Sequence, residues 1–361
     1  MMTTFTLLAA LAILAPKDGA VVPTQKDAQK AYFSGDRAER SLRMSNPSDR
    51  AKFAAVGATQ RPLELAWAGG ETNAVCVLKV VREGGALEVF SVTNRTKVYL
   101  TNLELGARYH WSVFDGRDTA AGTFVTEADA PRFLRADGVG NFRDIGGWRT
   151  ADGRRVRENR IFRSAGLRAS SRSEGNGLFS TRIVPGARRV TDAGLATLRN
   201  DFRIRTDLEL RTPQETAGMG TTLLGAGVKW VNESFAAYDF IDSPSRGKGP
   251  FGRIFRLFAD ERNYPVLMHC SGGRDRTGTL AFLLNGLLGV SEDDLCRDWE
   301  ATIFADRGPK FTFDRLQRLL DYLQTYPGDT LQSRIEVYAR SCGVTDDEIA
   351  AFRKLMLEPA R

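Results

Sequence analysis

The chain has 361 residues, 42% of them hydrophobic, which is long for one domain and comfortable for two. Its formal net charge of +7 and pI near 9.3 favour anionic partners, but no long Lys or Arg run is present, which argues against nucleic-acid binding. Four cysteines without a C-x-x-C pair and only two histidines exclude a disulfide framework, zinc sites built on such pairs, and sites built on several imidazoles.

Residues 1–20 are expected to form a signal peptide, because the apolar stretch from Phe5 to Ala15 resembles its h-region. The stretch is too short to span a bilayer, which takes about 20 residues. The segment before it lacks Lys and Arg, and neither Ala15 nor Ala20 ends a clean cleavage site, so a buried first strand or helix is the alternative. We expect a secreted or periplasmic protein without a transmembrane span. Residues 21–54 are polar and without a sustained period, which predicts a linker or lead-in.

Residues 55–128 are predicted to form a small β-sandwich. Short runs such as LELAW, AVCVLKVV and RYHWSVF are separated by turn signals such as AGGETN and FDGRD. The segments PLELAW and LTNLELGARYHWSVFDG resemble two strands of fibronectin type III-like domains. The resemblance implies a core position for Trp67, and a Tyr109 ring that packs inward while its hydroxyl bonds to the backbone. Alternation along the strand predicts that His110 points outward.

Residues 129–361 alternate strand and helix patterns, which predicts an α/β domain with a central sheet flanked by helices. Helices are expected within Thr191–Phe202 and where apolar residues recur at helical spacing, at Phe251, Ile254, Phe255 and Phe258 and again at Leu316, Leu319, Leu320 and Leu323. Thr345 and Glu348 form a capping box before a last helix. Residues 169–189 have no clear period and are predicted to be a surface loop or insertion.

The stretch VLMHCSGGRDRTG predicts a buried strand, a glycine-rich loop and a helix that begins near Thr277. Backbone N–H groups of such a loop, together with the helix N-terminus, can hold a phosphate. Gly272 and Gly273 permit the positive φ angles and the close approach that such a loop needs, and we expect Arg276 to grip two phosphate oxygens with its planar guanidinium. The expected phosphate contacts are Ser271, Gly272, Gly273, Arg274, Thr277 and Gly278.

Cys270 stands at the base of this loop, where N–H groups and Arg276 favour the thiolate. A thiolate in that position can attack phosphorus and form a phosphocysteine that water then hydrolyses. The loop is not a Walker A motif. A Cys-His protease is disfavoured, because His269 should project to the opposite side of the strand and support the loop by hydrogen bonding. No metal or cofactor is expected.

HCSGGRDRTG resembles the HC-x5-R-T/S signature of cysteine-dependent tyrosine and dual-specificity phosphatases. NFRDIGGWRTADGRRVRENRIFRSAGL, DLELRTPQE and the tail GVTDDEIAAFRKLML resemble a bacterial, often secreted, branch, from Pro131 to the C-terminus. The resemblance implies a cysteine-phosphatase fold, with phosphotyrosine, phosphoserine/threonine or phosphoinositide substrates. Two positions depart from that branch: Arg274 stands where Lys is common, and Glu209-Leu210-Arg211 stands where D-L-R is common.

The resemblance implies that Asp275 is the general acid, and Asp239 or Asp242 is the alternative. Asp144 and Arg163 either touch the loop or form structural salt bridges. Cys296 or Cys342 is a candidate disulfide partner for Cys270 in an oxidising compartment.

The sequence thus favours a phosphotyrosine phosphatase that acts on a phosphorylated protein or a phosphoinositide. One alternative is an adhesion or binding protein that uses a phosphatase fold only to hold phosphate. The other is an inositol phosphate hydrolase with the same thiol chemistry.

Overall fold

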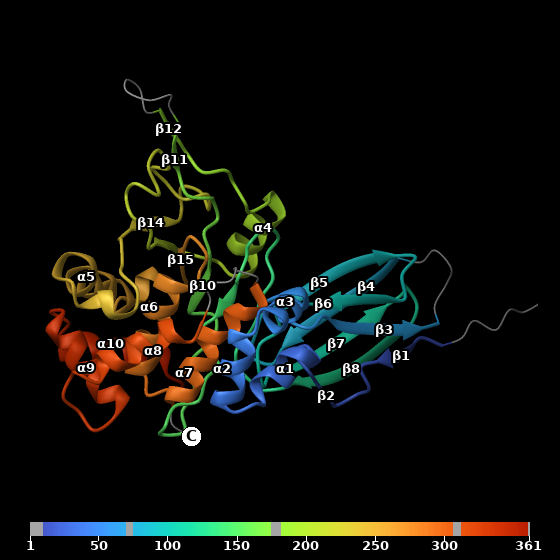
Figure 1. Cartoon of the computed structure of the whole chain (residues 1–361). Helices are drawn as coiled ribbons and strands as arrows, with labels where there is room; N and C mark the ends of the chain where they lie inside the picture. The colour runs from blue at the N-terminus through green and yellow to red at the C-terminus, as the bar shows by residue number, and fades with distance from the viewer. Residues whose placement is uncertain (1–9, 70–74, 175–181, 306–311, 360–361) are drawn as a thin grey trace, which may run out of the picture. The chain divides into compact units, whose positions relative to one another are not determined.

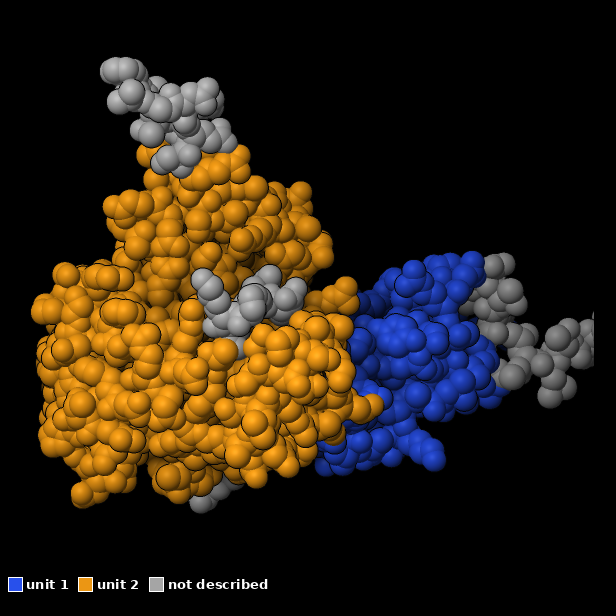
Figure 2. Space-filling model, viewed as in Figure 1, with its two compact units in different colours: residues 1–26, 60–129 blue, residues 27–59, 130–361 orange. Residues whose placement is uncertain are grey.

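The computed structural model describes residues 10–69, 75–174, 182–305 and 312–359. The chain forms two compact units, which Figure 2 colours separately. Unit 1 comprises residues 1–26 and 60–129, and unit 2 comprises residues 27–59 and 130–361. Within the described ranges, none of the helices combines the length and apolar character that crossing a membrane requires.

Unit 1 is a β-sandwich, as predicted. One sheet has the order β1-β3-β6 and the other the order β2-β8-β7-β4-β5. The strands are β1 (Ala12–Ala15), β2 (Ala20–Val22), β3 (Leu63–Ala68), β4 (Val75–Arg82), β5 (Leu87–Thr93), β6 (Lys97–Leu100), β7 (Arg108–Phe114) and β8 (Thr119–Thr126) (Figure 1).

The core of unit 1 is built from inward-facing residues of both sheets, which include Trp67 and Trp111. Tyr109 stacks on Phe124 with ring centroids 5.0 Å apart, and its hydroxyl accepts a 2.9 Å hydrogen bond from the backbone N–H of Glu104. His110 is exposed. These three sequence-based placements are confirmed, whereas the fibronectin type III-like classification stays a prediction.

The N-terminal boundaries differ from those expected. Residues 12–15, expected within the signal peptide, form β1, which pairs antiparallel with β3. Residues 20–22 form β2, which pairs parallel with β8. The apolar stretch that resembles an h-region therefore ends in a strand of the sandwich, which is the alternative that the sequence left open. Export itself stays a prediction.

The linker predicted at residues 21–54 is wrong in its larger part. Residues 27–59 form three helices, α1 (Asp27–Phe33), α2 (Arg37–Ser45) and α3 (Pro47–Val56), and belong to unit 2. These helices show no apolar period, because α3 buries none of its residues and the buried residues of α1 and α2 include the polar Gln29 and Arg40. The N-terminal caps of two of these helices are typical residues for that position. The Asp36 side chain accepts a hydrogen bond from Glu39 N–H at the start of α2, and the Asn46 side chain caps α3, with Pro47 in its first turn. We call residues 27–59 the helical brace.

The central sheet of unit 2 has the order β14-β13-β15-β10-β9. Its strands are β9 (Arg143–Asp144), β10 (Ile161–Ala165), β13 (Thr206–Glu209), β14 (Lys229–Asn232) and β15 (Val266–Cys270). All neighbours pair in parallel except β9, which is antiparallel to β10. The strand that ends at Cys270 thus lies in the middle of the sheet (Figure 1).

Helices pack on both faces of this sheet, so the predicted α/β class is confirmed. Phe162 and Leu267 face a core with α4 and η1, while their chain neighbours Ile161, Val266 and Met268 face the larger core. The helices are α4 (Asp192–Ala196), the π-helix η1 (Thr197–Asp201), the 3-10 helix η2 (Tyr238–Asp242), the π-helix η3 (Pro244–Lys248), α5 (Gly249–Phe258), the 3-10 helix η4 (Glu261–Asn263), α6 (Asp275–Leu287), α7 (Glu292–Glu300), the 3-10 helix η5 (Ala301–Ala305), α8 (Asp314–Leu323), α9 (Leu331–Ser341) and α10 (Asp346–Met356).

The predicted helices are confirmed, since both apolar stripes are buried, on α5 and on α8, and Thr345 and Glu348 form the expected capping box. The surface loop expected at residues 169–189 is only partly correct. It contains an antiparallel hairpin of β11 (Arg172–Glu174) and β12 (Arg182–Val184). Residues 175–181 lie outside the described residues.

Candidate active site

The loop after Cys270 lies between the central strand β15 and helix α6. Strands β10 and β13 flank β15, and Ala165 of β10 pairs with Cys270. The Cys270 side chain is buried, with 3% of the residue exposed. The strand, turn and helix that the motif predicts are therefore present, with Cys270 at the base of the turn.

The carbonyl groups of the loop are bound by side chains outside it. Asn141 Nδ2 donates to Gly272 O at 3.2 Å and to Gly273 O at 3.0 Å. Arg163 Nη2 donates to Gly273 O at 2.9 Å, and Arg189 Nη1 donates to Ser271 O at 3.0 Å. A backbone whose carbonyls are fixed outward directs its N–H groups inward, which is the arrangement of an anion-binding nest.

Of the two loop glycines, Gly273 has the required geometry. Its φ is +65°, and a Cβ there would collide with the backbone of Ser164. Gly272 does not use the positive φ that a glycine permits, and it has open space around it, so the requirement for glycine rests on Gly273.

The expected phosphate contact at Gly278 is not supported by the position of its backbone N–H. Its N–H donates to Arg274 O at 2.8 Å within the helix, so it does not face the loop centre. A Cβ at this position would lie 2.8 Å from Trp299 Cδ1. Gly278 therefore permits close packing of α6 on the Trp299 ring.

The Cys270 thiol has a pKa below its ordinary value. Burial raises this pKa, but the charge of Arg276, the hydroxyl and N–H of Thr277 and the N–H of Gly272 lower it by more. Thr277 is fully buried in the first turn of α6. The electrostatics that the sequence predicts around the sulfur are therefore present.

Arg276 is held by Glu215, a residue that sequence reasoning missed. Arg276 Nη1 and Nη2 lie 2.6 and 2.9 Å from the two carboxylate oxygens of Glu215. Burial raises the pKa of Glu215, but the hydrogen bonds from Arg276 and Thr212 lower it to about 2, so the pair is ionised at neutral pH. The sequence contained a signal for this residue, because Glu215 is the last residue of the motif DLELRTPQE.

Asp275 accepts hydrogen bonds from three side chains. Tyr238 Oη donates to Oδ1, Arg315 Nη1 lies 3.2 Å from Oδ1, and Arg274 Nε lies 3.0 Å from Oδ2. Burial raises the pKa of Asp275, but these three residues lower it below its ordinary value. Tyr238 has a φ of +57°, so an unusual backbone conformation presents its hydroxyl to Asp275.

The alternative acids make their described contacts elsewhere. Asp239 Oδ2 lies 2.6 Å from Arg318 Nη2 on α8. Asp242 Oδ1 lies 2.8 Å from Lys248 Nζ and accepts from Tyr322 Oη at 2.5 Å. These two carboxylates thus contact α8 and η3, whereas Asp275 lies at the end of the loop itself.

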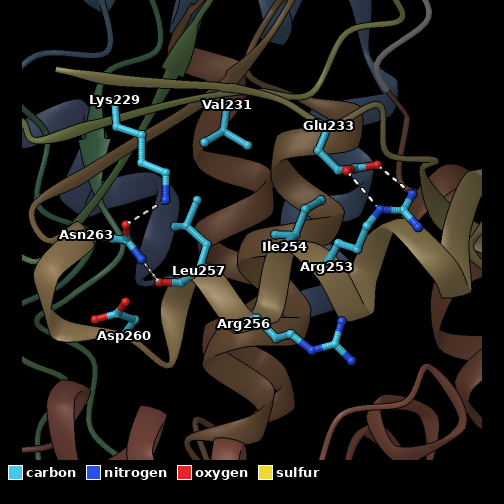
Figure 3. Close-up of a pocket in the computed structure, with 9 residues that line it drawn as sticks. All are labelled: Lys229, Val231, Glu233, Arg253, Ile254, Arg256, Leu257, Asp260 and Asn263. Atoms are coloured by element: carbon cyan, nitrogen blue, oxygen red, sulfur yellow. Dashed lines mark hydrogen bonds and ion pairs between the residues drawn. The ribbon is translucent and has the colours of Figure 1, made fainter.

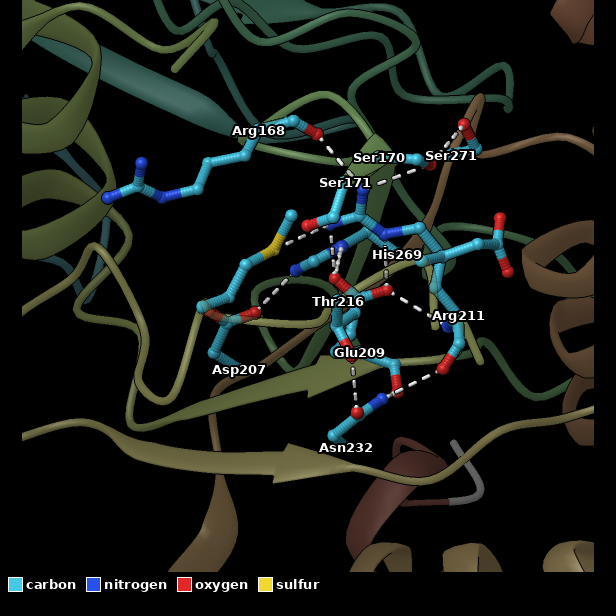
Figure 4. Close-up of polar contacts among 12 residues, drawn as sticks. Arg168, Ser170, Ser171, Asp207, Glu209, Arg211, Thr216, Asn232, His269 and Ser271 are labelled. Carbon is cyan, nitrogen blue, oxygen red and sulfur yellow. Dashed lines mark hydrogen bonds and ion pairs between the residues drawn. The ribbon is translucent and has the colours of Figure 1, made fainter. Parts of the chain in front are cut away.

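His269 contacts strand β13 instead of the loop. Its Nε2 lies 2.6 Å from Asp207 Oδ1, and its Nδ1 lies 3.4 Å from Glu209 Oε2 (Figure 4). Burial lowers the pKa of His269, but Glu209 and Asp207 raise it to about 9, so the ring is an imidazolium at neutral pH. The sequence predicted that His269 supports the loop by hydrogen bonding, whereas the side chain forms an ion pair with Asp207 on the neighbouring strand. Its direction away from Cys270 agrees with the alternation of β15.

Glu209 also binds Arg211, which reaches the segment beside the loop. Arg211 Nε and Nη2 lie 2.9 and 2.6 Å from the Glu209 carboxylate oxygens. Arg211 Nη1 donates to Arg168 O at 3.2 Å and lies 3.5 Å from Ser170 Oγ, which is 3.5 Å from Ser271 Oγ (Figure 4). Glu209 and Arg211, the two charged residues of the Glu-Leu-Arg sequence, are thus connected through Ser170 to Ser271 of the loop.

The sequence left open whether Asp144 and Arg163 touch the loop or form structural salt bridges, and the two residues differ in this respect. Arg163 is fully buried, binds Gly273 O and forms an ion pair with Asp298, so it both touches the loop and is salt-bridged. Asp144 lies 3.0 Å from Arg132 Nη1 and accepts from Gly146 N–H and Asn159 N–H, so its contacts are structural.

All four cysteines are free thiols. Burial is the main cause that raises the pKa of Cys296 to about 12 and that of Cys342 to about 11. These two thiols are poor nucleophiles near neutral pH, in contrast to Cys270.

A pocket of about 350 Å³ lies away from this loop, between β14 and α5 (Figure 3). Its charged lining residues make polar contacts of their own: Arg253 Nη2 is 2.8 Å from Glu233 Oε1, and Lys229 Nζ donates to Asn263 Oδ1 at 3.1 Å. It contains none of the residues predicted for the site.

The sequence is similar to those of known tyrosine phosphatases. Residues 134–183 and 186–358 match a family model described as "Tyrosine phosphatase family". A protein of Cupriavidus necator named "Putative tyrosine-protein phosphatase" is 28% identical over 185 residues, which cover 46% of this chain. The match spans 61% of the length of that relative.

Two solved structures are also similar. The core catalytic domain of the PP-IP phosphatase SIW14 from S. cerevisiae, in complex with citrate, is 15% identical, and the match covers 54% of this chain and 97% of that one with a TM-score of 0.28. A further structure of the Siw14 catalytic core is 16% identical, covers 58% of this chain and 95% of that one, and has a TM-score of 0.30. Both TM-scores are low, so the family match carries the assignment. Because the matched residues make up more than half of the sequence and include the Cys270 loop, the chain belongs to the tyrosine phosphatase family.

Proposed function

We propose that this protein is a cysteine-dependent phosphomonoesterase that hydrolyses phosphotyrosine. The observation that carries the proposal is the Cys270 thiol, which is buried, has a lowered pKa and ends the central strand beside Arg276. Lowering the pKa of a buried thiol requires charges and donors arranged around it, and the same groups are suited to a phosphate dianion.

In the first step, the Cys270 thiolate attacks phosphorus in line with the leaving oxygen. A P–S bond forms as the P–O bond breaks, and the N–H groups of the loop and Arg276 hold the equatorial oxygens. The electron pair of the broken bond goes to the leaving oxygen, which takes a proton from Asp275.

In the second step, water attacks the phosphocysteine. Asp275, now a carboxylate, accepts a proton from this water, a P–O bond forms and the P–S bond breaks. Inorganic phosphate and the Cys270 thiolate are released, and Thr277 is positioned to donate its hydroxyl to the departing sulfur.

Asp275 must carry a proton to act as the acid, although its pKa in the free protein is lowered by Arg274, Tyr238 and Arg315. A phosphate dianion in the loop would compete for the two arginines and add negative charge beside the carboxyl. Both effects raise the pKa of Asp275 towards the range in which it is protonated.

A second candidate substrate is a phosphoinositide head group. Arg189, Arg274 and Arg315 lie at the loop or bind groups in it, and guanidinium groups suit a ligand with more than one phosphate. A protein that only holds phosphate is the non-catalytic alternative.

A kinetic panel tests the proposal. Turnover of p-nitrophenyl phosphate, a phosphotyrosine peptide, a phosphoserine peptide and a phosphoinositide is compared in the wild type, in Cys270→Ser and in the control Cys342→Ser. We expect hydrolysis of the phosphotyrosine peptide, lost only in Cys270→Ser. Phosphate binding without turnover by the wild type would favour the non-catalytic alternative, and preferential turnover of the phosphoinositide would favour the second substrate.

A further inference from the structure

A second pocket, of about 420 Å³, lies beside the ion pair between Glu215 and Arg276. The β11–β12 hairpin supplies Ile183 and Arg172, and the turn at residues 213–217 supplies Pro213, Glu215 and Ala217. We call this the hairpin pocket. Unlike the pocket of Figure 3, it shares a residue with the candidate active site.

The two walls of the hairpin pocket are fixed to each other. The backbone N–H of Ser171, next to β11, donates to Glu215 O at 2.8 Å, and the Ser171 hydroxyl donates to Ala217 O at 2.8 Å. Ile183 is in turn paired with Ser173 across the hairpin. The pocket is therefore formed before any ligand arrives, which reduces the entropic cost of binding.

Glu215 connects the hairpin pocket to the site of chemistry. Its carboxylate holds both Nη atoms of Arg276, at 2.6 and 2.9 Å, and it also lines the pocket. The pocket therefore begins one side chain away from the guanidinium that is expected to grip the phosphate. A substrate that extends beyond its phosphorylated group can reach it.

The lining of the hairpin pocket suits an apolar group. Ile183 is 53% exposed, and Pro213 and Ala217 add apolar surface beside it. The carboxylate of Glu215 is neutralised by Arg276, and among the described lining residues Arg172 is the one other charged side chain, beside the uncharged Ser171 and Gln214. A pocket for further phosphates would be expected to carry several cations, whereas an exposed isoleucine gains free energy by covering its surface.

Resting on the phosphotyrosine activity proposed above, we propose that the hairpin pocket is a specificity subsite. It binds an apolar side chain that flanks the phosphotyrosine of a peptide substrate, with Ile183 as the main contact. Residues next to the phosphotyrosine would then determine which proteins are dephosphorylated efficiently.

Two matched phosphotyrosine peptides test this subsite, one with Leu and the other with Ser at both positions that flank the phosphotyrosine. The full chain should hydrolyse the Leu peptide with a kcat/KM about tenfold higher, since an apolar pocket discriminates by factors of 10 to 200. Ile183→Asp should remove this preference and leave kcat/KM for p-nitrophenyl phosphate unchanged, because that small substrate does not reach the pocket. Ala217→Phe, which fills the pocket, should have the same effect.

The matched control is Leu42→Asp, which introduces the same charge at another exposed apolar residue, on α2. It should keep the preference for the Leu peptide. Equal turnover of both peptides by the wild type, or a preference that persists in Ile183→Asp, would overturn the subsite. So would a parallel loss on p-nitrophenyl phosphate in both pocket variants, because the pocket residues would then only support the loop. A wild type inactive on every substrate, including p-nitrophenyl phosphate, would instead overturn the proposed function.

Discussion

Arg276 can grip a phosphate only if its guanidinium is held in one orientation, and Glu215 provides that restraint with both carboxylate oxygens. Glu215→Gln should lower kcat/KM for p-nitrophenyl phosphate by about 10 to 100-fold, because small displacements of a side chain that positions the substrate have effects of that size. The neighbouring change Gln214→Ala serves as the control and should have little effect. Similar values for Glu215→Gln and the wild type would show that Arg276 is oriented by other contacts.

The same ion pair has a defined pH dependence. Folding lowers the pKa of Glu215 to about 2, so its contribution to stability is present above the unfolded value of about 4.3 and is lost as the pH falls through about 2. Changes in kcat between pH 4 and 8 therefore have to come from other groups, and the proposed candidate is Asp275 after a bound phosphate has raised its pKa.

Tyr238 sets the protonation of Asp275 by donating to its carboxylate. Tyr238→Phe removes a donor that favours the ionised form, so the pKa of Asp275 should rise. A general acid must be protonated, and the basic limb of the kcat–pH profile should therefore move to higher pH. Asp275→Asn should abolish that limb, while Asp239→Asn should leave it in place. A limb that disappears in Asp239→Asn and survives in Asp275→Asn would transfer the role to Asp239.

The proposed catalytic residues could be selected from the sequence because Cys270, Asp275 and Arg276 lie in one short stretch whose motif predicts a strand, a loop and a helix. Their partners Glu215, Tyr238 and Arg315 come from distant segments and meet the loop only through the fold. The sequence could not show that Gly273 and not Gly272 takes the positive φ, because the spacing of two glycines does not determine this.

At the scale of elements, the helical brace is tied to α7 through a buried arginine. Arg40 is fully buried and lies 2.6 Å from Glu300 and 2.5 Å from Asp293. Helix α7 also carries Asp298, the partner of Arg163, which binds the loop at Gly273. A segment outside the matched family region thus packs on the helix whose Asp298 binds Arg163 beside the Cys270 loop.

Arg40→Ala should lower the free energy of unfolding of unit 2 by about 3 to 5 kcal/mol, because it leaves the buried Glu300 carboxylate without its partner. Urea unfolding monitored by tryptophan fluorescence measures the change. The control is Arg43→Ala on the same helix, where the described hydrogen bond is an exposed one to Ala31 O and the loss should be within about 0.5 kcal/mol. Equal effects of the two changes would contradict a structural role for the buried pair.

Elements with a clear apolar pattern were predictable, and those without one were not. The stripes of α5 and α8 bury their apolar residues as expected, because in each helix these residues recur at helical spacing along one face. The brace helices and the β11–β12 hairpin are stabilised by tertiary contacts, such as the Arg40 ion pair and the bonds of Ser171, that leave no period in the sequence.

At the scale of the whole molecule, unit 2 is discontinuous in sequence, since residues 27–59 precede most of unit 1 and pack on the phosphatase fold. Tyr32 and Phe53 form edge-to-face contacts with Phe304 of η5, with ring centroids 5.6 and 5.7 Å apart. A phosphatase domain cut from the chain at residue 130 would expose this aromatic surface.

The fragment 130–361 is therefore expected to be aggregation-prone and to melt well below the full chain, by 10 °C or more on the scale of about 2 to 4 °C per kcal/mol. Linking residues 27–59 to residues 130–361 should restore the Tm of unit 2, and calorimetry of the three proteins measures this. A fragment 130–361 that melts with the full chain would show that the brace is dispensable for the fold.

The most direct test of the whole account is the detection of phosphate on Cys270 during turnover. The full chain is mixed rapidly with p-nitrophenyl phosphate, quenched, digested and analysed by mass spectrometry. We predict one phosphoryl group on the peptide that contains Cys270, together with a burst of p-nitrophenol, and neither in Cys270→Ser. Turnover without phosphate on Cys270, or undiminished turnover by Cys270→Ser, would contradict the mechanism.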